Sequence, residues 1–397
     1  MRPFLASLAL VALQSPLLAE TAERDRFDGA GRIVILDESH KLHVVAPSGK
    51  LLASPASIAI RQGNSAARFI SGRFIVSGYD AEARAFVRIH DALDLAFPEI
   101  AAFKGHARAS LNDAGTRIAL TGDGKDNTTI EIADVAKPET RVKVWPAQGE
   151  RALLGESAWC GPDRFAFTAH LVGSKKGSSD LYVWEQGAVK KVTDGLYVSQ
   201  ISVSPDGARL LAVRSESLAT LECTVDLLTF SSGEWKTVAK AGQTRPEQVA
   251  WSADGKRFAL AEETGLRICP VSGEAGEVIA AGRCGGATWS PDGRRLAYTK
   301  LSKGYMLEGV IRDLEGIKTA NLGTTVCADG GCVLAFASLL WSPDGTAVAF
   351  ERGVKSNGDD PRVRESHRET WVCAPDGSGA FRLREGATVL LGWLPAK

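Results

Sequence analysis

An all-β fold, a β-propeller of four-stranded antiparallel blades, is predicted by three features of the sequence. One tight turn recurs along the chain in near copies, a second hairpin follows most of these copies, and the two chain ends read as complementary parts of one blade. A four-stranded sheet cannot bury both faces alone, whereas a ring of such sheets buries each against its neighbours. We expect eight blades, or seven if one degenerate copy is miscounted.

The recurring turn occurs four times with little change in sequence. The copies are VSPDGARLLA from Val203, WSADGKRFAL from Trp251, WSPDGRRLAY from Trp289 and WSPDGTAVAF from Trp341. Ser, Pro, Asp and Gly suit successive positions of a type I turn, because Pro presets φ and Gly tolerates a left-handed backbone. Short apolar runs flank the turn, so each copy predicts a hairpin, strands a and b of a blade.

Weaker hairpins at 180–193, 266–279 and 370–383 supply strands c and d. Degenerate copies of the turn lie at 69–78, 111–120 and 159–167. The spacing from Trp251 to Trp289 is 38 residues and from Trp289 to Trp341 it is 52, the range of one propeller blade. The recurring tryptophans end strand a, so we expect them to fill the gaps between blades rather than to stack on a ligand.

The chain ends predict how the ring closes. Residues 31–52 read as strands b, c and d without a preceding strand a, and residues 387–397 read as a strand a without a partner. Pairing the two would protect the last open edge. We therefore expect residues 27–397 to form a single β-propeller domain.

The repeat resembles the TolB-type, or WD-like, propeller repeat. The residues that carry the resemblance are 180–193, 289–298, 341–350 and 371–383. The resemblance implies the fold and says almost nothing about activity. It extends to the repeats and not to TolB itself, whose six-bladed propeller follows a separate α/β domain.

Residues 1–19 read as a secretory signal peptide. Arg2 is followed by an apolar run from Pro3 to Leu13 and then by small residues, with cleavage expected after Ala19 or Ala22. The run is shorter than the ~20 residues that span a bilayer, and we expect no transmembrane segment. The sequence thus predicts a periplasmic or secreted protein.

Composition narrows the function classes. The 397 residues include 47 basic and 47 acidic side chains, and this balance argues against a nucleic-acid-binding surface. No nucleophile elbow, zinc helix or phosphate-binding loop is present, so we expect no catalytic residues, no metal and no cofactor. Among seven cysteines, Cys327 and Cys332 flank a turn and are a candidate disulfide, whereas Cys269 and Cys373 are not expected to pair.

Binding residues are expected in the b–c loops, which vary while the a–b turns do not. These loops lie at 121–129, 169–180, 299–309 and 351–370. The last one carries the candidate binding residues Asp359, Asp360, Arg362, Arg364, His367 and Arg368. They could grip an anionic group or an acidic patch of a partner, or form a solvated insertion whose charges screen one another.

The predicted function is a monomeric protein-binding or scaffold module whose partner is another protein or an envelope component. The alternative is a propeller enzyme, a lyase or hydrolase, with a site in the central funnel. Converging carboxylates and histidines would favour the enzyme. His40 and His43 are expected to be solvated turn residues on opposite faces of their hairpin.

Overall fold

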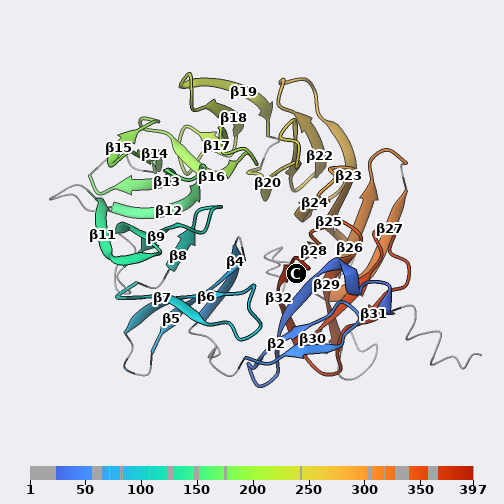
Figure 1. The fold of residues 1–397 in the computed structure, drawn as a ribbon. Helices are drawn as coiled ribbons and strands as arrows, with labels where there is room; N and C mark the ends of the chain where they lie inside the picture. Colours follow the sequence, from blue (N-terminus) through green and yellow to red (C-terminus); the bar gives the residue numbers. More distant parts are fainter. Residues whose placement is uncertain are drawn as a thin grey trace, which may run out of the picture.

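The computed structural model describes residues 24–396 except 56–64, 71, 81, 83, 107, 123–128, 147–151, 174–176, 242–243, 303–305, 317, 327–338 and 356–364. Its strands form eight four-stranded antiparallel sheets arranged around a centre (Figure 1). The predicted all-β propeller is confirmed, with eight blades rather than seven. A 3-10 turn, η1 (Asp28–Ala30), precedes the first strand.

Each blade is numbered here by its place along the chain, with strand a innermost. Blade 1 contains β32 (Thr388–Leu394), β1 (Arg32–Asp37), β2 (Leu42–Val45) and β3 (Leu51–Ala53). Blade 2 contains β4 (Ser65–Ile70), β5 (Arg73–Tyr79), β6 (Ala85–Asp91) and β7 (Glu99–Lys104). Blade 3 contains β8 (Arg108–Leu111), β9 (Arg117–Thr121), β10 (Ile130–Asp134) and β11 (Lys137–Trp145). Blade 4 contains β12 (Ala152–Trp159), β13 (Arg164–Leu171), β14 (Asp180–Glu185) and β15 (Ala188–Lys191).

The second half of the ring continues in the same order. Blade 5 contains β16 (Tyr197–Val203), β17 (Arg209–Ser215), β18 (Thr224–Thr229) and β19 (Glu234–Lys240). Blade 6 contains β20 (Gln248–Trp251), β21 (Arg257–Ala261), β22 (Gly265–Pro270) and β23 (Glu277–Ala281). Blade 7 contains β24 (Cys284–Trp289), β25 (Arg295–Ser302), β26 (Met306–Asp313) and β27 (Thr319–Val326). Blade 8 contains β28 (Leu339–Trp341), β29 (Val348–Lys355), β30 (Glu365–Cys373) and β31 (Phe381–Arg382).

The ring closes as the chain ends predicted. The C-terminal strand β32 pairs antiparallel with the N-terminal strand β1, with Arg32 opposite Leu394 and Ile33 opposite Trp393. The N-terminal segment adds a second contact at this seam, where Phe27 packs on Phe381 of blade 8 with ring centroids 5.9 Å apart. Blade 1 is thus built from both ends of the propeller.

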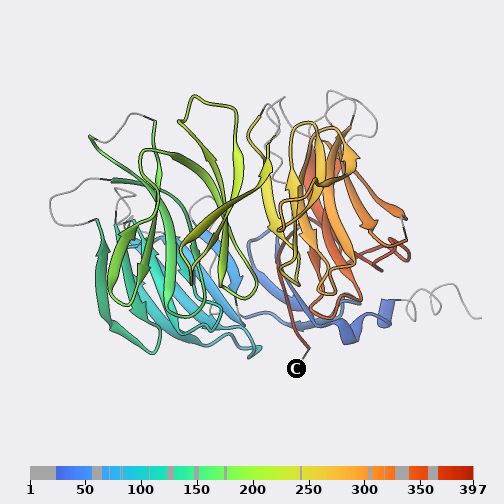
Figure 2. The same cartoon turned by 90° about the horizontal axis from the view of Figure 1, so that it is seen from above.

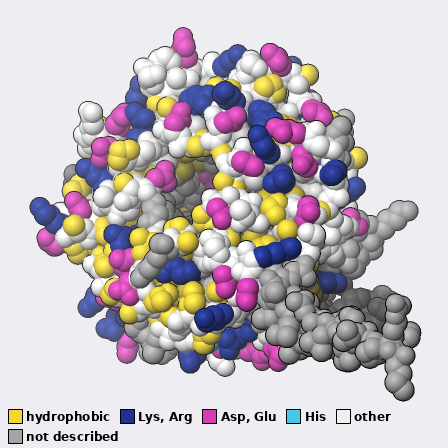
Figure 3. All heavy atoms as spheres, turned by 45° about the vertical axis from the view of Figure 1, so that its right-hand side comes forward, with side chains coloured by type: hydrophobic (Ala, Val, Ile, Leu, Met, Phe, Trp, Pro, Cys, Tyr) yellow, Lys and Arg dark blue, Asp and Glu magenta, His cyan; other side chains and the backbone are white. Residues whose placement is uncertain are grey.

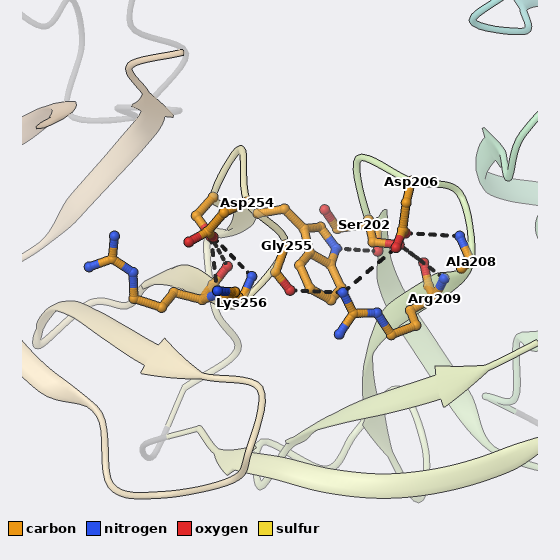
Figure 4. Close-up of polar contacts among 11 residues, drawn as sticks. Ser202, Asp206, Ala208, Arg209, Asp254, Gly255 and Lys256 are labelled. Atoms are coloured by element: carbon orange, nitrogen blue, oxygen red, sulfur yellow. Dashed lines mark hydrogen bonds and ion pairs between the residues drawn. The ribbon is translucent and has the colours of Figure 1, made fainter. Parts of the chain in front are cut away.

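The repeated turn is fastened by the same side-chain hydrogen bonds in several blades. In blade 5 the Ser204 hydroxyl accepts from the N–H of Arg209 at 2.9 Å, and the Asp206 carboxylate accepts from the N–H of Ala208 at 3.0 Å. Arg209 then reaches the carbonyl of Gly255 in the turn of blade 6 at 2.9 Å (Figure 4). The turn therefore closes its own hairpin and also ties that hairpin to the next blade.

The recurring tryptophans are core residues, as expected. Trp251, Trp289 and Trp341 are each less than one-tenth exposed. Each indole Nε1–H donates to a carbonyl of strand a in the preceding blade, for example Trp289 to Ala250 at 3.0 Å. Trp159, Trp251 and Trp341 repeat this bond with Ser110, Ser202 and Thr288. The motif thus joins neighbouring blades by packing and by one hydrogen bond.

The two faces of the ring differ in what they carry. The C-terminal end of β32 lies at the lower side in Figure 2, so the a–b turns belong to that side and the b–c loops to the upper side. Seven of the eight strands b begin with arginine on the a–b side: Arg32, Arg73, Arg117, Arg164, Arg209, Arg257 and Arg295. No helix in the described part of the chain is long and apolar enough to cross a membrane.

Candidate functional site

The predicted binding loop of blade 8 is only partly described. Asp359, Asp360, Arg362 and Arg364 lie outside the described residues, as do Cys327 and Cys332 of the candidate disulfide. His367 lies in β30, opposite Val354 of β29. Only Arg368 can be placed with its side chain.

Arg368 contacts a buried carboxylate of its own blade. Its guanidinium Nη1 lies 3.5 Å from Oε2 of Glu351, and the Glu351 side chain is only 2% exposed. The other oxygen of Glu351 accepts a hydrogen bond from the main-chain N–H of Leu390 in β32, with an N···O distance of 2.6 Å. Arg368 therefore supports the closing seam of the ring, a role that sequence reasoning did not assign to it.

A second b–c loop, which sequence reasoning overlooked, is rigidly held on the same face. We call residues 216–222, between β17 and β18 of blade 5, the leucine loop. Arg245, which precedes strand a of blade 6, donates to three of its carbonyls, those of Ser217 and Thr220 at 3.3 Å and that of Leu218. One guanidinium thus fixes the backbone of most of the loop.

Two further contacts hold Arg245 and the leucine loop in place. The Arg245 guanidinium lies 4.6 Å from the ring centroid of Tyr197, a cation–π arrangement at the start of strand a in blade 5. The N–H of Leu218 donates to the carbonyl of Gly177 in the b–c loop of blade 4 at 2.8 Å. The leucine loop is therefore anchored to three consecutive blades.

This fixed loop keeps apolar side chains in solvent. Leu218 is 53% exposed and Leu221 is 57% exposed, and Val172 in the neighbouring loop of blade 4 is 64% exposed. Exposed glutamates, Glu216 and Glu222, stand at the two ends of the leucine loop. The only sequence signal for this site was a short polar segment carrying two leucines between two apolar strands.

Charges of both signs alternate over the surface seen in Figure 3, which is hollowed near the centre of the ring. This even distribution agrees with the equal numbers of acidic and basic residues. Within the described ranges, no group of three or more His, Cys, Asp or Glu side chains could hold a metal ion.

The expectation of solvated histidines is wrong for His43, which is 4% exposed. Its Nε2 lies 2.7 Å from Oδ2 of Asp37 and its Nδ1 lies 2.8 Å from the hydroxyl of Ser54. In serine hydrolases the serine faces Nε2 and the aspartate faces Nδ1, the reverse of this order. The three residues fasten the b–c turn of blade 1 to its outer strands, because β2 and β3 are the third and fourth strands of the sheet.

His40 is half-buried, and three further histidines bond within the fold. His90 contacts the carbonyl of Phe97 at 2.9 Å, and burial, the main cause, lowers the pKa of His90. His170 contacts the carbonyl of Ser178 at 2.7 Å. His106 Nε2 lies 3.2 Å from the carboxylate of Glu131. Glu131 belongs to β10, the third strand of blade 3, and not to the innermost strand. These histidines stay apart, each in its own blade.

The described cysteines are buried and free: Cys160, Cys223, Cys269, Cys284 and Cys373. The expectation that Cys269 and Cys373 do not pair is confirmed. Burial raises the pKa of Cys160 and of Cys373 to about 12. Such thiols are almost fully protonated at neutral pH, so they are poor nucleophiles.

Comparisons with known proteins identify the architecture. The sequence matches no protein-family model, and no curated protein matches it significantly. Dihydro-heme d1 dehydrogenase NirN, solved in complex with DHE, is similar with a TM-score of 0.58 and 14% identity, over 92% of this chain and 74% of that one. Porphyromonas gingivalis dipeptidyl peptidase 4 is similar with a TM-score of 0.59 and 12% identity, over 92% of this chain and 60% of that one.

TolB from Acinetobacter baumannii is also among the similar structures, with a TM-score of 0.41 and 16% identity, over 84% of this chain and 80% of that one. At such identities the likeness concerns the fold alone. The chain is an eight-bladed β-propeller, and these similarities concern that fold and nothing finer.

Proposed function

We propose that this protein is an exported binding module that holds a partner protein on its b–c face. The observation that carries the proposal is the leucine loop, whose backbone is clamped by Arg245 while Leu218 and Leu221 remain more than half exposed. Its ligand is another protein or an envelope component, bound by one copy of the chain.

Preorganisation supports this function. Ordering a loop during association costs free energy, and a loop already fixed in the free protein avoids most of that cost. Apolar side chains exposed on such a loop gain about 25 cal/mol for each Å² that a partner removes from water. Both conditions meet in the leucine loop.

The funnel enzyme has less support. Convergence of carboxylates and histidines at the ring centre is the arrangement that would favour it. In the described part of the chain, His43 and His106 bond to acids on outer strands, and His90 and His170 bond to backbone carbonyls. These contacts fasten blades and leave the imidazoles engaged within the fold.

The test compares two pairs of exposed leucines. Leu218→Ser with Leu221→Ser changes the leucine loop, whereas Leu51→Ser with Leu52→Ser changes β3, where the side chains are 49% and 38% exposed. The tagged mature protein is used to capture partners from a cell-envelope extract. We expect a stoichiometric partner that both the wild type and the β3 variant retain and that the loop variant loses.

Equal capture by all three proteins would reject the loop as the binding surface. If none of the three proteins captures a partner and the wild type turns over a sugar or peptide substrate, the protein is an enzyme instead. Export has its own test: fractionation of cells that express the full chain, with N-terminal sequencing. The mature protein should begin at Glu20 or Glu23 in the periplasm or medium.

A further inference from the structure

Arg32, the first residue of strand b in blade 1, is a buried arginine that forms no ion pair with a carboxylate in the part of the chain that the structure describes. The residue is 6% exposed. Its Nε donates to the carbonyl of Pro395 at 3.4 Å and its Nη1 to the carbonyl of Leu93 at 3.2 Å. Its Nη2 is buried and has no hydrogen-bond partner among the described residues. A buried charge that is neither paired nor fully hydrogen-bonded is costly.

Among the equivalent arginines, Arg209 and Arg257 face Thr229 and Pro270 in blades 5 and 6, whereas those of blades 2, 4 and 7 are paired with an acid. Arg73 lies opposite Asp91 in register and 3.3 Å from its carboxylate, and Arg295 lies opposite Asp313 at 3.9 Å. Arg164 is likewise opposite Glu185 and ion-paired with it. In each case the acid is the last residue of strand c.

In blade 1 the position of that acid is occupied by alanine. Ile33 pairs with Val45, which sets Ala46 opposite Arg32. Ala46 is itself buried, at 6% exposure. Within the described part of the chain, Arg32 therefore has only backbone carbonyls as acceptors.

We propose that Arg32 binds the carboxylate of an organic anion on the a–b face, between blades 1 and 2. A carboxylate accepts from a guanidinium through charge-assisted hydrogen bonds, and it carries the single charge that Arg32 needs. Leu93 and Pro395, whose carbonyls hold the guanidinium, have apolar side chains, which suit the body of an organic acid better than a hydrated phosphate dianion.

The site lies directly under the surface. Leu93 is 44% exposed, and Pro395 is exposed as well. The carbonyls of these two residues hold the guanidinium. A small ligand therefore needs to displace only these exposed residues to reach it. The site is on the opposite face from the leucine loop and does not depend on the proposed partner binding.

The experiment measures the melting temperature of the mature protein in sodium butyrate, in inorganic phosphate and in sodium chloride of equal ionic strength. A ligand that binds only the folded state raises this temperature in step with the logarithm of its concentration once that concentration exceeds Kd. We expect butyrate to raise it by about 2–4 °C at concentrations several times its Kd, with phosphate weaker and chloride inactive. Arg32→Met should abolish the response. Arg257→Met, which loses a bond to the carbonyl of Gly293 and a cation–π contact with Trp289, should retain it.

A second pair of variants keeps the test decisive if Arg32→Met does not fold. Ala46→Asp restores the acid that blades 2, 4 and 7 possess, whereas Ala46→Asn has the same shape without charge. We expect the melting temperature of Ala46→Asp to be higher than that of Ala46→Asn and to be unaffected by butyrate. The proposal is overturned if the wild type does not respond to butyrate, if phosphate acts as strongly, or if the two Ala46 variants behave alike.

Discussion

Glu351 and Leu390 join the two ends of the propeller by a hydrogen bond of 2.6 Å from the Leu390 N–H to the Glu351 carboxylate. Glu351 belongs to strand b of blade 8, and Leu390 belongs to the strand that completes blade 1. Beside this bond, the hydroxyl of Thr388 accepts from the N–H of Thr370 at 2.8 Å. The seam is therefore fastened by buried polar bonds in addition to the β1–β32 ladder.

Removing the Glu351 carboxylate should loosen this seam. Glu351→Ala removes the carboxylate that accepts from the buried Leu390 N–H, which costs about 1–3 kcal/mol, and it also removes the ion pair with Arg368. We expect faster hydrogen exchange at the Leu390 amide and a lower urea midpoint, with Glu351→Gln intermediate. Glu315→Ala, at a side chain that is 71% exposed, is the control and should change neither quantity.

The indole bond between blades can be isolated by comparing two tryptophans. Trp289→Phe removes the donor to the carbonyl of Ala250. Trp184 is equally buried, but its Nε1 has no hydrogen-bond partner within the described ranges. We expect Trp289→Phe to lower the free energy of unfolding by about 1 kcal/mol more than Trp184→Phe. Equal losses in urea titrations would mean that packing alone explains the recurring tryptophan.

Lowering the pH should destabilise the folded protein through the protonation of Asp226 in blade 5. Its burial raises the pKa, but hydrogen bonds from Arg214 at 2.8 Å and from Thr224 and Thr237 at 2.5 Å outweigh that effect and hold the pKa below its ordinary value. A lowered folded-state pKa gives stability that is present above the ordinary value of 3.8 and is lost as pH falls through the folded pKa.

Asp226→Asn should therefore flatten the acid limb of a plot of unfolding free energy against pH between pH 5 and about 2. At pH 7 the variant should be less stable by about 3–5 kcal/mol, because it leaves the Arg214 charge without its buried partner. An unchanged acid limb would show that other carboxylates control the acid unfolding.

Raising the pH should destabilise the folded protein, because its buried thiols resist deprotonation. Burial raises the pKa of Cys373 from 9.0 to about 12, so the folded state keeps its proton where the unfolded state loses it. The stabilisation is complete below pH 9 and is lost as pH rises towards 12, by about 1 kcal/mol at pH 10 for each such thiol. Cys373→Ala should reduce the slope of unfolding free energy between pH 8 and 10.5.

Thiol labelling gives an independent check of these cysteines. In the native protein at pH 8, Cys160 and Cys373 should not react with a disulfide reagent, and both should react after unfolding in urea. Fast labelling of either thiol in native buffer would contradict the burial on which the alkaline prediction depends.

The sequence by itself determined the blades. Ser-Pro-Asp-Gly is recognisable because each residue type has a local reason to occupy its turn position, and the tryptophan at the end of strand a is recognisable because it repeats. The closing of the ring was also predictable, since 31–52 lacks a strand a and 387–397 supplies one. These inferences rest on the local conformational preferences of residue types and on the spacing of repeats, and both can be read from a single sequence.

The tertiary structure alone decided the sites, because each depends on residues far apart in the chain. Arg245 clamps Leu218 from the next blade, Glu351 holds Leu390 across the seam, and Arg32 meets the carbonyl of Leu93 from the second blade. His43 is buried because Asp37 and Ser54 reach it from a turn and from the end of the outer strand. Such contacts follow from the ring closure and the sheet register, and spacing along the sequence does not encode them.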